Sequence, residues 1–286
     1  MSLRNPGLHP EAIFHKPMGI MFQSLKILAL ALGVVGSLPG LGRAAEIQEV
    51  PELAAAFHRA GATGTFVLWD PGTRTFQGHQ ADRARTRFVP ASTFKIPNTL
   101  IGLECGAVSG VDEVFPYDGK PRFLKEWEKP MSLRDGIKVS NVPVYQELAR
   151  RIGLKRMREG VEKLEYGNAD IGTVVDRFWL DGPLEISALE QVEFLRRLAA
   201  GDLPFSRQAQ ETVGEILLLE TKDGTRLYGK TGWLMARQPD LGWFVGWVEK
   251  DGVVTPFALN MDLPSKDLGP VRVALARECL AALGKF

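Results

Sequence analysis

LGWFVGWVEKDGVVTPFALNMD, residues 241–262, carries the clearest structural signal in this chain. Two runs rich in valine, tryptophan, phenylalanine and leucine, 241–249 and 253–262, are joined by the tripeptide KDG. Such residues favour strands, and a short connection that ends in glycine favours a hairpin between them. The stretch therefore predicts two adjacent antiparallel strands.

Further strands and two helices are predicted outward from this hairpin. Residues 226–230 precede it, and residues 64–70 and 73–79 flank Pro71-Gly72, a turn signal with strand-forming residues on both sides. Helices are predicted at residues 51–58 and 270–283. In the second helix apolar residues recur at helical spacing, which predicts a buried stripe of Val273, Leu275, Ala276, Leu280 and Leu283.

The middle of the chain is predicted to be helical, at residues 93–102, 142–152, 154–164, 187–200 and 209–219. The simplest fold class is α/β in the α+β sense, an antiparallel sheet flanked by N- and C-terminal helices. An all-helical lobe, about residues 85–220, is inserted between the strands of the sheet. A cleft between sheet and lobe is the expected position of a functional site.

The composition indicates one globular domain, residues 46–286. Of the 286 residues, 45% are hydrophobic and 24% charged, which suits a substantial core and argues against disorder. The formal net charge is +1, and no basic run or aromatic-basic pattern is present. These features exclude nucleic acid and an anionic membrane surface as expected partners. The expected substrate is therefore a small molecule or a peptide.

Residues 1–45 are predicted to be a leader and an export signal. Lys26 precedes the apolar stretch 27–38, Pro39-Gly40 follows it, and Gly42-Arg43-Ala44 supplies small residues for cleavage. The apolar stretch is too short to span a bilayer comfortably. No cysteine near the junction accepts a lipid, so we expect no membrane contact after signal cleavage.

The chain has two cysteines, Cys105 and Cys279, in or beside different predicted helices. An exported protein permits one disulfide, but nothing in the sequence brings these residues together. Two buried thiols are the favoured interpretation.

Ser92-Thr93-Phe94-Lys95 is the first of three short motifs that indicate chemistry. A serine hydroxyl needs a neighbouring base to act as a nucleophile, and a lysine three residues later on a helix lies on the same face. All 4 histidines precede Ser92 in the chain, two of them in the predicted leader, which disfavours a Ser-His-Asp arrangement. The motif predicts a base derived from Lys95.

The other two motifs are Ser140-Asn141-Val142 and Lys230-Thr231-Gly232. Each has an ordinary structural explanation, because Ser and Asn before Pro143 are natural helix caps and Lys-Thr-Gly is a natural strand end. Neither explanation accounts for the occurrence of all three motifs in this order. The ordered set therefore indicates a serine acyl-transfer site.

With these motifs the chain resembles the penicillin-recognising serine enzymes, and within them the class D, or oxacillinase-type, β-lactamases. Tyr166-Gly167-Asn168 and Phe178-Trp179-Leu180 match two further patterns of that class. The resemblance runs from about Gly64 to the C-terminus. It implies a β-lactamase/transpeptidase-like fold, a small-molecule β-lactam substrate and hydrolysis through a serine acyl-enzyme. The predicted export signal implies a periplasmic location.

The resemblance also assigns the acylation residues. Ser92 is the nucleophile, and backbone N–H groups of Ser92 and Trp233 hold the oxyanion. Ser140, next to Lys230, passes a proton to the departing lactam nitrogen. Thr231 and Arg272 hold the substrate carboxylate, and Arg272 matches the family provided that the loop before it differs in length. The full predicted substrate-binding set is Val142, Trp179, Lys230, Thr231, Gly232, Trp233 and Arg272, whereas Trp243 is assigned to the core.

Deacylation is implied to depend on Lys95 carrying a carboxyl group taken from carbon dioxide. Phe94, Val142, Trp179 and Leu180 supply an apolar pocket for it, and the Trp179 indole N–H is the expected donor. No metal and no other cofactor are expected. Two alternatives stay open, a penicillin-binding sensor domain that acylates and stalls, and a D-Ala-D-Ala carboxypeptidase or transpeptidase.

Overall fold

The computed structural model describes residues 46–286, which belong to one compact unit. The predicted leader and export signal lie outside the described residues, and the predicted domain limits stay a prediction. Within residues 46–286 no helix has the length and apolar character needed to cross a membrane.

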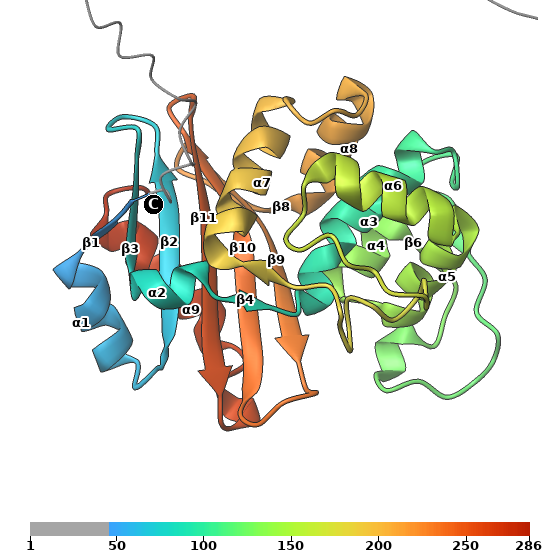
Figure 1. Cartoon of the computed structure of the whole chain (residues 1–286), viewed down its shortest axis with the longest axis horizontal. Helices are drawn as coiled ribbons and strands as arrows, with labels where there is room; N and C mark the ends of the chain where they lie inside the picture. Colours follow the sequence, from blue (N-terminus) through green and yellow to red (C-terminus); the bar gives the residue numbers. More distant parts are fainter. Residues whose placement is uncertain (1–45) are drawn as a thin grey trace, which may run out of the picture. The chain divides into compact units, whose positions relative to one another are not determined.

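A seven-stranded sheet forms the centre of this unit, in the order β1-β3-β2-β11-β10-β9-β8 (Figure 1). The predicted hairpin is confirmed, because β10 and β11 pair antiparallel from Asp240 with Leu263 to Lys250 with Val253. The strands are β1 (Ile47–Glu49), β2 (Gly64–Asp70), β3 (Thr75–His79), β8 (Leu218–Lys222), β9 (Thr225–Leu234), β10 (Asp240–Lys250) and β11 (Val253–Leu263).

Two details of the predicted sheet are wrong. The sheet is mixed rather than antiparallel, because β1 pairs parallel with β3, and a strand of three residues shows no readable alternation. The helix predicted to end at residue 219 ends at Leu217, and Leu218 and Leu219 enter β8. The apolar run of three leucines suits either a helix end or a strand, so the sequence does not fix this boundary.

One face of the sheet is covered by the terminal helices α1 (Pro51–Arg59) and α9 (Val271–Ala282), as predicted. Leu275, Ala276 and Leu280 of the expected stripe are buried in the core on this face. Val273 and Leu283 are partly buried against the same core. The buried stripe is therefore confirmed, with two members at its margin.

The other face carries α7 (Ala188–Ala200), which packs on β2, β10 and β11, and beside it the helical lobe (Figure 1). The helix α7 begins with a capping box formed by Ser187 and Glu190. In the lobe, Gly153 has φ 79° and separates α5 from α6. The remaining helices are α2 (Ala81–Arg85), α3 (Lys95–Glu104), α4 (Leu133–Lys138), α5 (Val142–Ile152), α6 (Leu154–Leu164) and α8 (Arg207–Leu217).

The inserted lobe is not all-helical, in contrast to the prediction. It contains two short antiparallel pairs, β4 (Arg87–Phe88) with β7 (Ile186–Ser187) and β5 (Val114–Phe115) with β6 (Met131–Ser132). Pairs of two residues are too short to leave a strand pattern in the sequence.

Both cysteines are free thiols, as favoured from the sequence. Cys279 lies on α9 and is fully buried in the core between this helix and the sheet. Cys105 is partly buried against the core on the opposite, lobe side of the sheet. The two thiols belong to different cores, which prevents a bridge.

Candidate active site

Ser92 lies on a short 3₁₀ turn, η1 (Ala91–Phe94), that leads directly into α3. Lys95 is the first residue of α3, and its side chain is fully buried. The Lys95 Nζ lies 3.0 Å from the Ser92 Oγ, within hydrogen-bond distance. The structure therefore places the two residues together as the spacing of the first motif predicts.

Lys95 is surrounded by aromatic rings rather than by carboxylates. Its Nζ lies 5.1 Å from the centroid of the Tyr145 ring, and the neighbouring Phe94 stacks on Trp179 at a centroid distance of 5.4 Å. Burial, with a smaller contribution from the charge of Lys230, holds the pKa of Lys95 well below its ordinary value. The lowered pKa favours the neutral amine, the form that accepts a proton or reacts with carbon dioxide.

The Trp179 indole is fully buried, and its Nε1 has no hydrogen-bond partner among the residues that the structure describes. A buried N–H group without an acceptor costs about 1–3 kcal/mol, so such groups call for an explanation. This donor belongs to the ring that stacks on Phe94, the residue next to Lys95.

Ser140 and Lys230 form the second functional pair. The Lys230 Nζ donates to the Ser140 Oγ and, at 2.9 Å, to the backbone oxygen of Thr231. Burial, reinforced by the charge of Arg272, lowers the pKa of Lys230 to about 7. A lysine with this pKa exchanges a proton readily at neutral pH, which suits a relay through Ser140.

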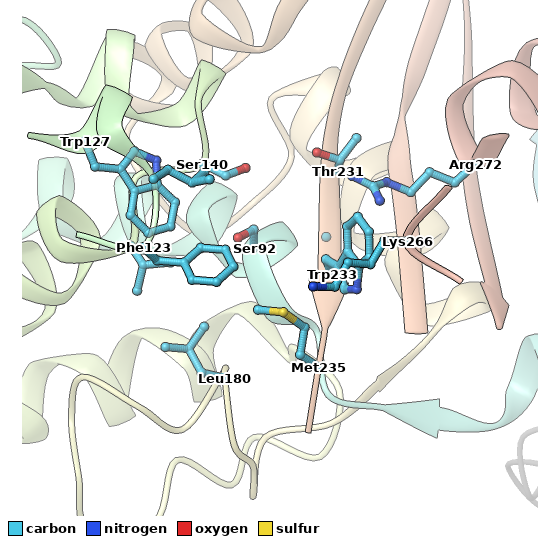
Figure 2. A pocket seen from close by; sticks show the side chains of 13 residues that line it. Ser92, Phe123, Trp127, Ser140, Leu180, Thr231, Trp233, Met235, Lys266 and Arg272 are labelled. Carbon is cyan, nitrogen blue, oxygen red and sulfur yellow. The ribbon is translucent and has the colours of Figure 1, made fainter. Parts of the chain in front are cut away.

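A cleft of about 390 Å³ opens above these pairs between the lobe and β9 (Figure 2). Its lining combines seven predicted site residues with apolar side chains, and the predicted residues are Ser92, Ser140, Val142, Thr231, Gly232, Trp233 and Arg272. The Trp243 indole is buried and donates to the backbone oxygen of Val89 at 3.1 Å, which confirms its assignment to the core.

Two residues of the predicted substrate-binding set do not line the cleft. Trp179 lies behind it, fully buried against Phe94, and Lys230 lies beneath Ser140 with 4% of its surface exposed. The expected direct contact between Trp179 and substrate is therefore wrong, because the Trp179 ring is fully buried and packs on Phe94, next to Lys95.

Sequence reasoning missed five residues of the lining. Phe123, Leu124 and Trp127 come from the irregular connection between β5 and β6, where no periodicity singles out a side chain. Met235 follows β9, and Lys266 begins the turn η3 (Lys266–Leu268) before α9. In the structure Phe123 and Met235 stand out as large apolar side chains that are 74% and 55% exposed, but this exposure cannot be read from the sequence. The missed residues are Phe123, Leu124, Trp127, Met235 and Lys266.

Arg272 projects from α9 toward the cleft, with its Cζ 5.2 Å from the centroid of the Trp233 ring. Its Nε and Nη1 are buried and have no hydrogen-bond partner within residues 46–286. Burial lowers the pKa of Arg272 to about 10, so the guanidinium is still charged at neutral pH. A carboxylate is the natural partner for these donors.

Tyr166-Gly167-Asn168 supports the site from behind rather than lining it. The Gln191 Nε2 donates both to the Tyr166 hydroxyl and to the Thr93 Oγ1 at 3.0 Å, which ties the triplet to the turn that carries Ser92. Gly167 has φ 60°, and a Cβ there would lie 2.0 Å from the backbone oxygen of Glu185. Only glycine fits this close approach.

Comparisons with known proteins agree with this geometry. The family model described as the penicillin binding protein transpeptidase domain matches residues 64–281. The chain is 42% identical to β-lactamase OXA-5 from Pseudomonas aeruginosa, covering 80% of this chain and 86% of the relative. It is 41% identical to β-lactamase OXA-48 from Klebsiella pneumoniae, covering 90% and 97%.

Solved structures give the same result. The class D β-lactamase FUS-1 (OXA-85) from Fusobacterium nucleatum subsp. polymorphum superposes with a TM-score of 0.81 at 46% identity, covering 84% of this chain and 100% of that one. The class D β-lactamase YbXI from Nostoc has a TM-score of 0.80 at 39% identity, covering 82% and 99%.

Proposed function

This chain belongs to the class D serine β-lactamases, and on that premise we propose that it hydrolyses β-lactam antibiotics through an acyl-enzyme on Ser92. The observation that carries the proposal is the pair of Ser92 and the buried Lys95, 3.0 Å apart at the base of a cleft that suits a small molecule. The chemistry is acyl transfer from a cyclic amide to serine and then to water.

In acylation the Ser92 Oγ attacks the lactam carbonyl while Lys95 takes the hydroxyl proton. Backbone N–H groups of Ser92 and Trp233 hold the oxyanion, a role supported by the position of both residues on the cleft wall. The lactam C–N bond then breaks, and Ser140 gives its proton to the nitrogen and is reprotonated from Lys230, its hydrogen-bond partner.

Thr231 and Arg272 orient the substrate by holding its carboxylate. Support comes from the positive charge of Arg272, whose pKa of about 10 keeps it charged at neutral pH, and from the place of both residues on the β9 side of the cleft (Figure 2). A planar guanidinium presents two parallel donors to a carboxylate, which fixes the direction of the lactam ring relative to Ser92.

For deacylation we propose that Lys95 first gives up the proton it took from Ser92, and that the neutral amine then reacts with carbon dioxide, releasing one further proton and gaining a carboxylate on Nζ. The residues present fit this group. The pocket is apolar, burial lowers the pKa of the Lys95 amine, and the buried Trp179 N–H has no hydrogen-bond acceptor within residues 46–286. When present, the carboxylate supplies a general base for the hydrolytic water. Trp179 then fixes its orientation, and Phe94 keeps bulk water away.

We also propose that the mature enzyme is exported to the periplasm. The support is the sequence of residues 1–45, in which a lysine, a short apolar stretch and small residues follow the order of a cleavable signal.

The function is tested by following purified mature protein with benzylpenicillin and, in parallel, with a peptide ending in D-Ala-D-Ala. We expect many turnovers of penicillin per enzyme and none of the peptide. A single burst of acylation without turnover favours a penicillin-binding sensor. Faster release of D-alanine than of penicilloate favours a carboxypeptidase, and either outcome contradicts the proposal.

Arg272→Ala is expected to weaken penicillin recognition by about 1.5–3 kcal/mol, the usual range for a hydrogen bond to a charged group. Steady-state kinetics should show this loss in kcat/KM, with little change in the melting temperature. Arg277→Ala is the matched control, since Arg277 lies on the same helix and pairs with Glu220 away from the cleft. Equal kinetics in both variants would assign the carboxylate to another residue.

A further inference from the structure

Lys266 places a second cation at the carboxylate end of the cleft. Its turn, η3, is closed by the backbone N–H of Gly269, which donates to the Lys266 oxygen at 3.0 Å. The turn packs directly on the Trp233 ring, because a Cβ on Gly269 would lie 2.5 Å from that ring. Arg272 contacts the same indole, so Lys266 and Arg272 both border Trp233 at the cleft (Figure 2).

The positive charge of Lys266 has no acidic partner within residues 46–286. Within residues 46–286 no acidic side chain lines the cleft and Lys266 forms no ion pair. The acidic groups nearby are engaged elsewhere, since Asp240 accepts from the Trp233 Nε1 at 2.8 Å and Asp267 is bonded to Ser265. Arg272 suffices for the single carboxylate common to penicillins, which leaves Lys266 facing solvent.

The opposite wall of the cleft has a different chemistry. Figure 2 shows Phe123, Trp127 and Leu180 across the cleft from Arg272 and Lys266. Because Arg272 holds the carboxylate on the ring fused to the lactam, the acylamino side chain of the substrate extends toward this apolar wall. A second anion therefore meets Lys266 only when it is attached to the carboxylate-bearing ring.

We propose that Lys266 forms a second anion subsite, which favours β-lactams whose carboxylate-bearing ring carries an additional anionic substituent. The inference rests on the proposed function and names the substrate class that this site prefers. The subsite is solvent-exposed, so its effect is modest and decreases as salt is added.

A matched pair of cephalosporins tests the subsite. Both carry the mandelamido side chain, and they differ only at C3, in a neutral methyltetrazolylthiomethyl group or its anionic sulfomethyl analogue. Each compound competes with a chromogenic cephalosporin for the enzyme. Even a slowly hydrolysed compound then yields an apparent second-order rate constant for acylation. Benzylpenicillin and its α-carboxy derivative form a second pair, in which the added anion is on the side chain.

We expect Lys266→Ala to lower the apparent second-order rate constant for the sulfomethyl compound about two- to fivefold relative to its neutral partner. Lys266→Glu should lower it further, and the penicillin pair should keep its ratio in both variants. Lys222→Ala, which removes an exposed lysine remote from the cleft, should change none of these ratios.

Three outcomes overturn the subsite while the proposed function stands: an unchanged cephalosporin ratio in Lys266→Ala, an equal loss on both cephalosporins, or a parallel change in the penicillin pair. Failure of every compound to acylate the wild-type enzyme contradicts the proposed function itself. The wild-type rates therefore separate the two kinds of failure.

Discussion

Ser92→Ala is expected to abolish covalent labelling by benzylpenicillin and to reduce hydrolysis about 10⁴-fold or more, the scale on which nucleophile removal acts in serine enzymes. The physical reason is that, in the described part of the chain, Ser92 carries the only hydroxyl that is hydrogen-bonded to the Lys95 Nζ. Intact-mass spectrometry should show one acyl adduct on the wild type, on the tryptic peptide that contains Ser92, and none on the variant.

Ser140→Ala is the matched comparison, because it removes a hydroxyl of the same cleft. It should still form the adduct on Ser92, but slowly, since the lactam nitrogen loses its proton donor. The Lys230 ammonium also loses its Ser140 partner. An adduct that persists in Ser92→Ala would remove Ser92 from its role.

Turnover by the wild type is expected to depend on bicarbonate and to be lost in acid. Burial lowers the pKa of Lys95, so the amine becomes neutral as pH rises through that lowered value, and carboxylation releases a further proton. Both steps run backward as pH falls. Activity should decline in acidic or carbon-dioxide-depleted buffer and return with bicarbonate, and labelled bicarbonate should give a carbamate carbon signal absent from Lys95→Ala.

Two variants separate the base from its donor. Lys95→Ala should slow deacylation about 10²- to 10⁴-fold, the usual contribution of a general base, and leave either a long-lived adduct or very slow acylation. Trp179→Phe keeps the stacking on Phe94 but removes the indole N–H. It should acylate normally, accumulate the acyl-enzyme, and recover partly at high bicarbonate.

The control for the indole is Trp243→Phe, since Trp243 is equally buried but donates to the Val89 oxygen. It should lose stability without raising the bicarbonate concentration that turnover needs above that of the wild type. Turnover that is independent of bicarbonate, with no carbamate signal, would show that an unmodified Lys95 acts as the base.

The sequence predicted the elements with long, regular patterns. The β10–β11 hairpin follows from two runs of strand-forming residues around a short connection that ends in glycine, and the stripe on α9 follows from apolar residues at helical spacing. Elements without such length, such as β1 and the pairs β4–β7 and β5–β6, have too few residues to show a period.

The residues of the site also fall into those that the sequence predicts and those that it does not. Ser92, Ser140 and Lys230 belong to motifs with fixed order, and the structure brings them together. Phe123 and Lys266 come from irregular segments, where the position of a side chain depends on how the loop packs and not on its neighbours in sequence. Trp179 was found by its motif, but its placement behind the cleft follows from packing on Phe94.

The hydrogen bond between Ser140 and Lys230 joins positions 90 residues apart in the chain, one in the inserted lobe and the other on β9. A contact of such long sequence separation carries an entropic cost of loop closure, which the packing of the lobe on the sheet must offset. A chain with a docked hairpin but an unseated lobe has native-like strands and no proton relay. The proton relay therefore exists only while the lobe is seated on the sheet, so rapid acylation by penicillin reports the docking of lobe and sheet as well as the integrity of the site.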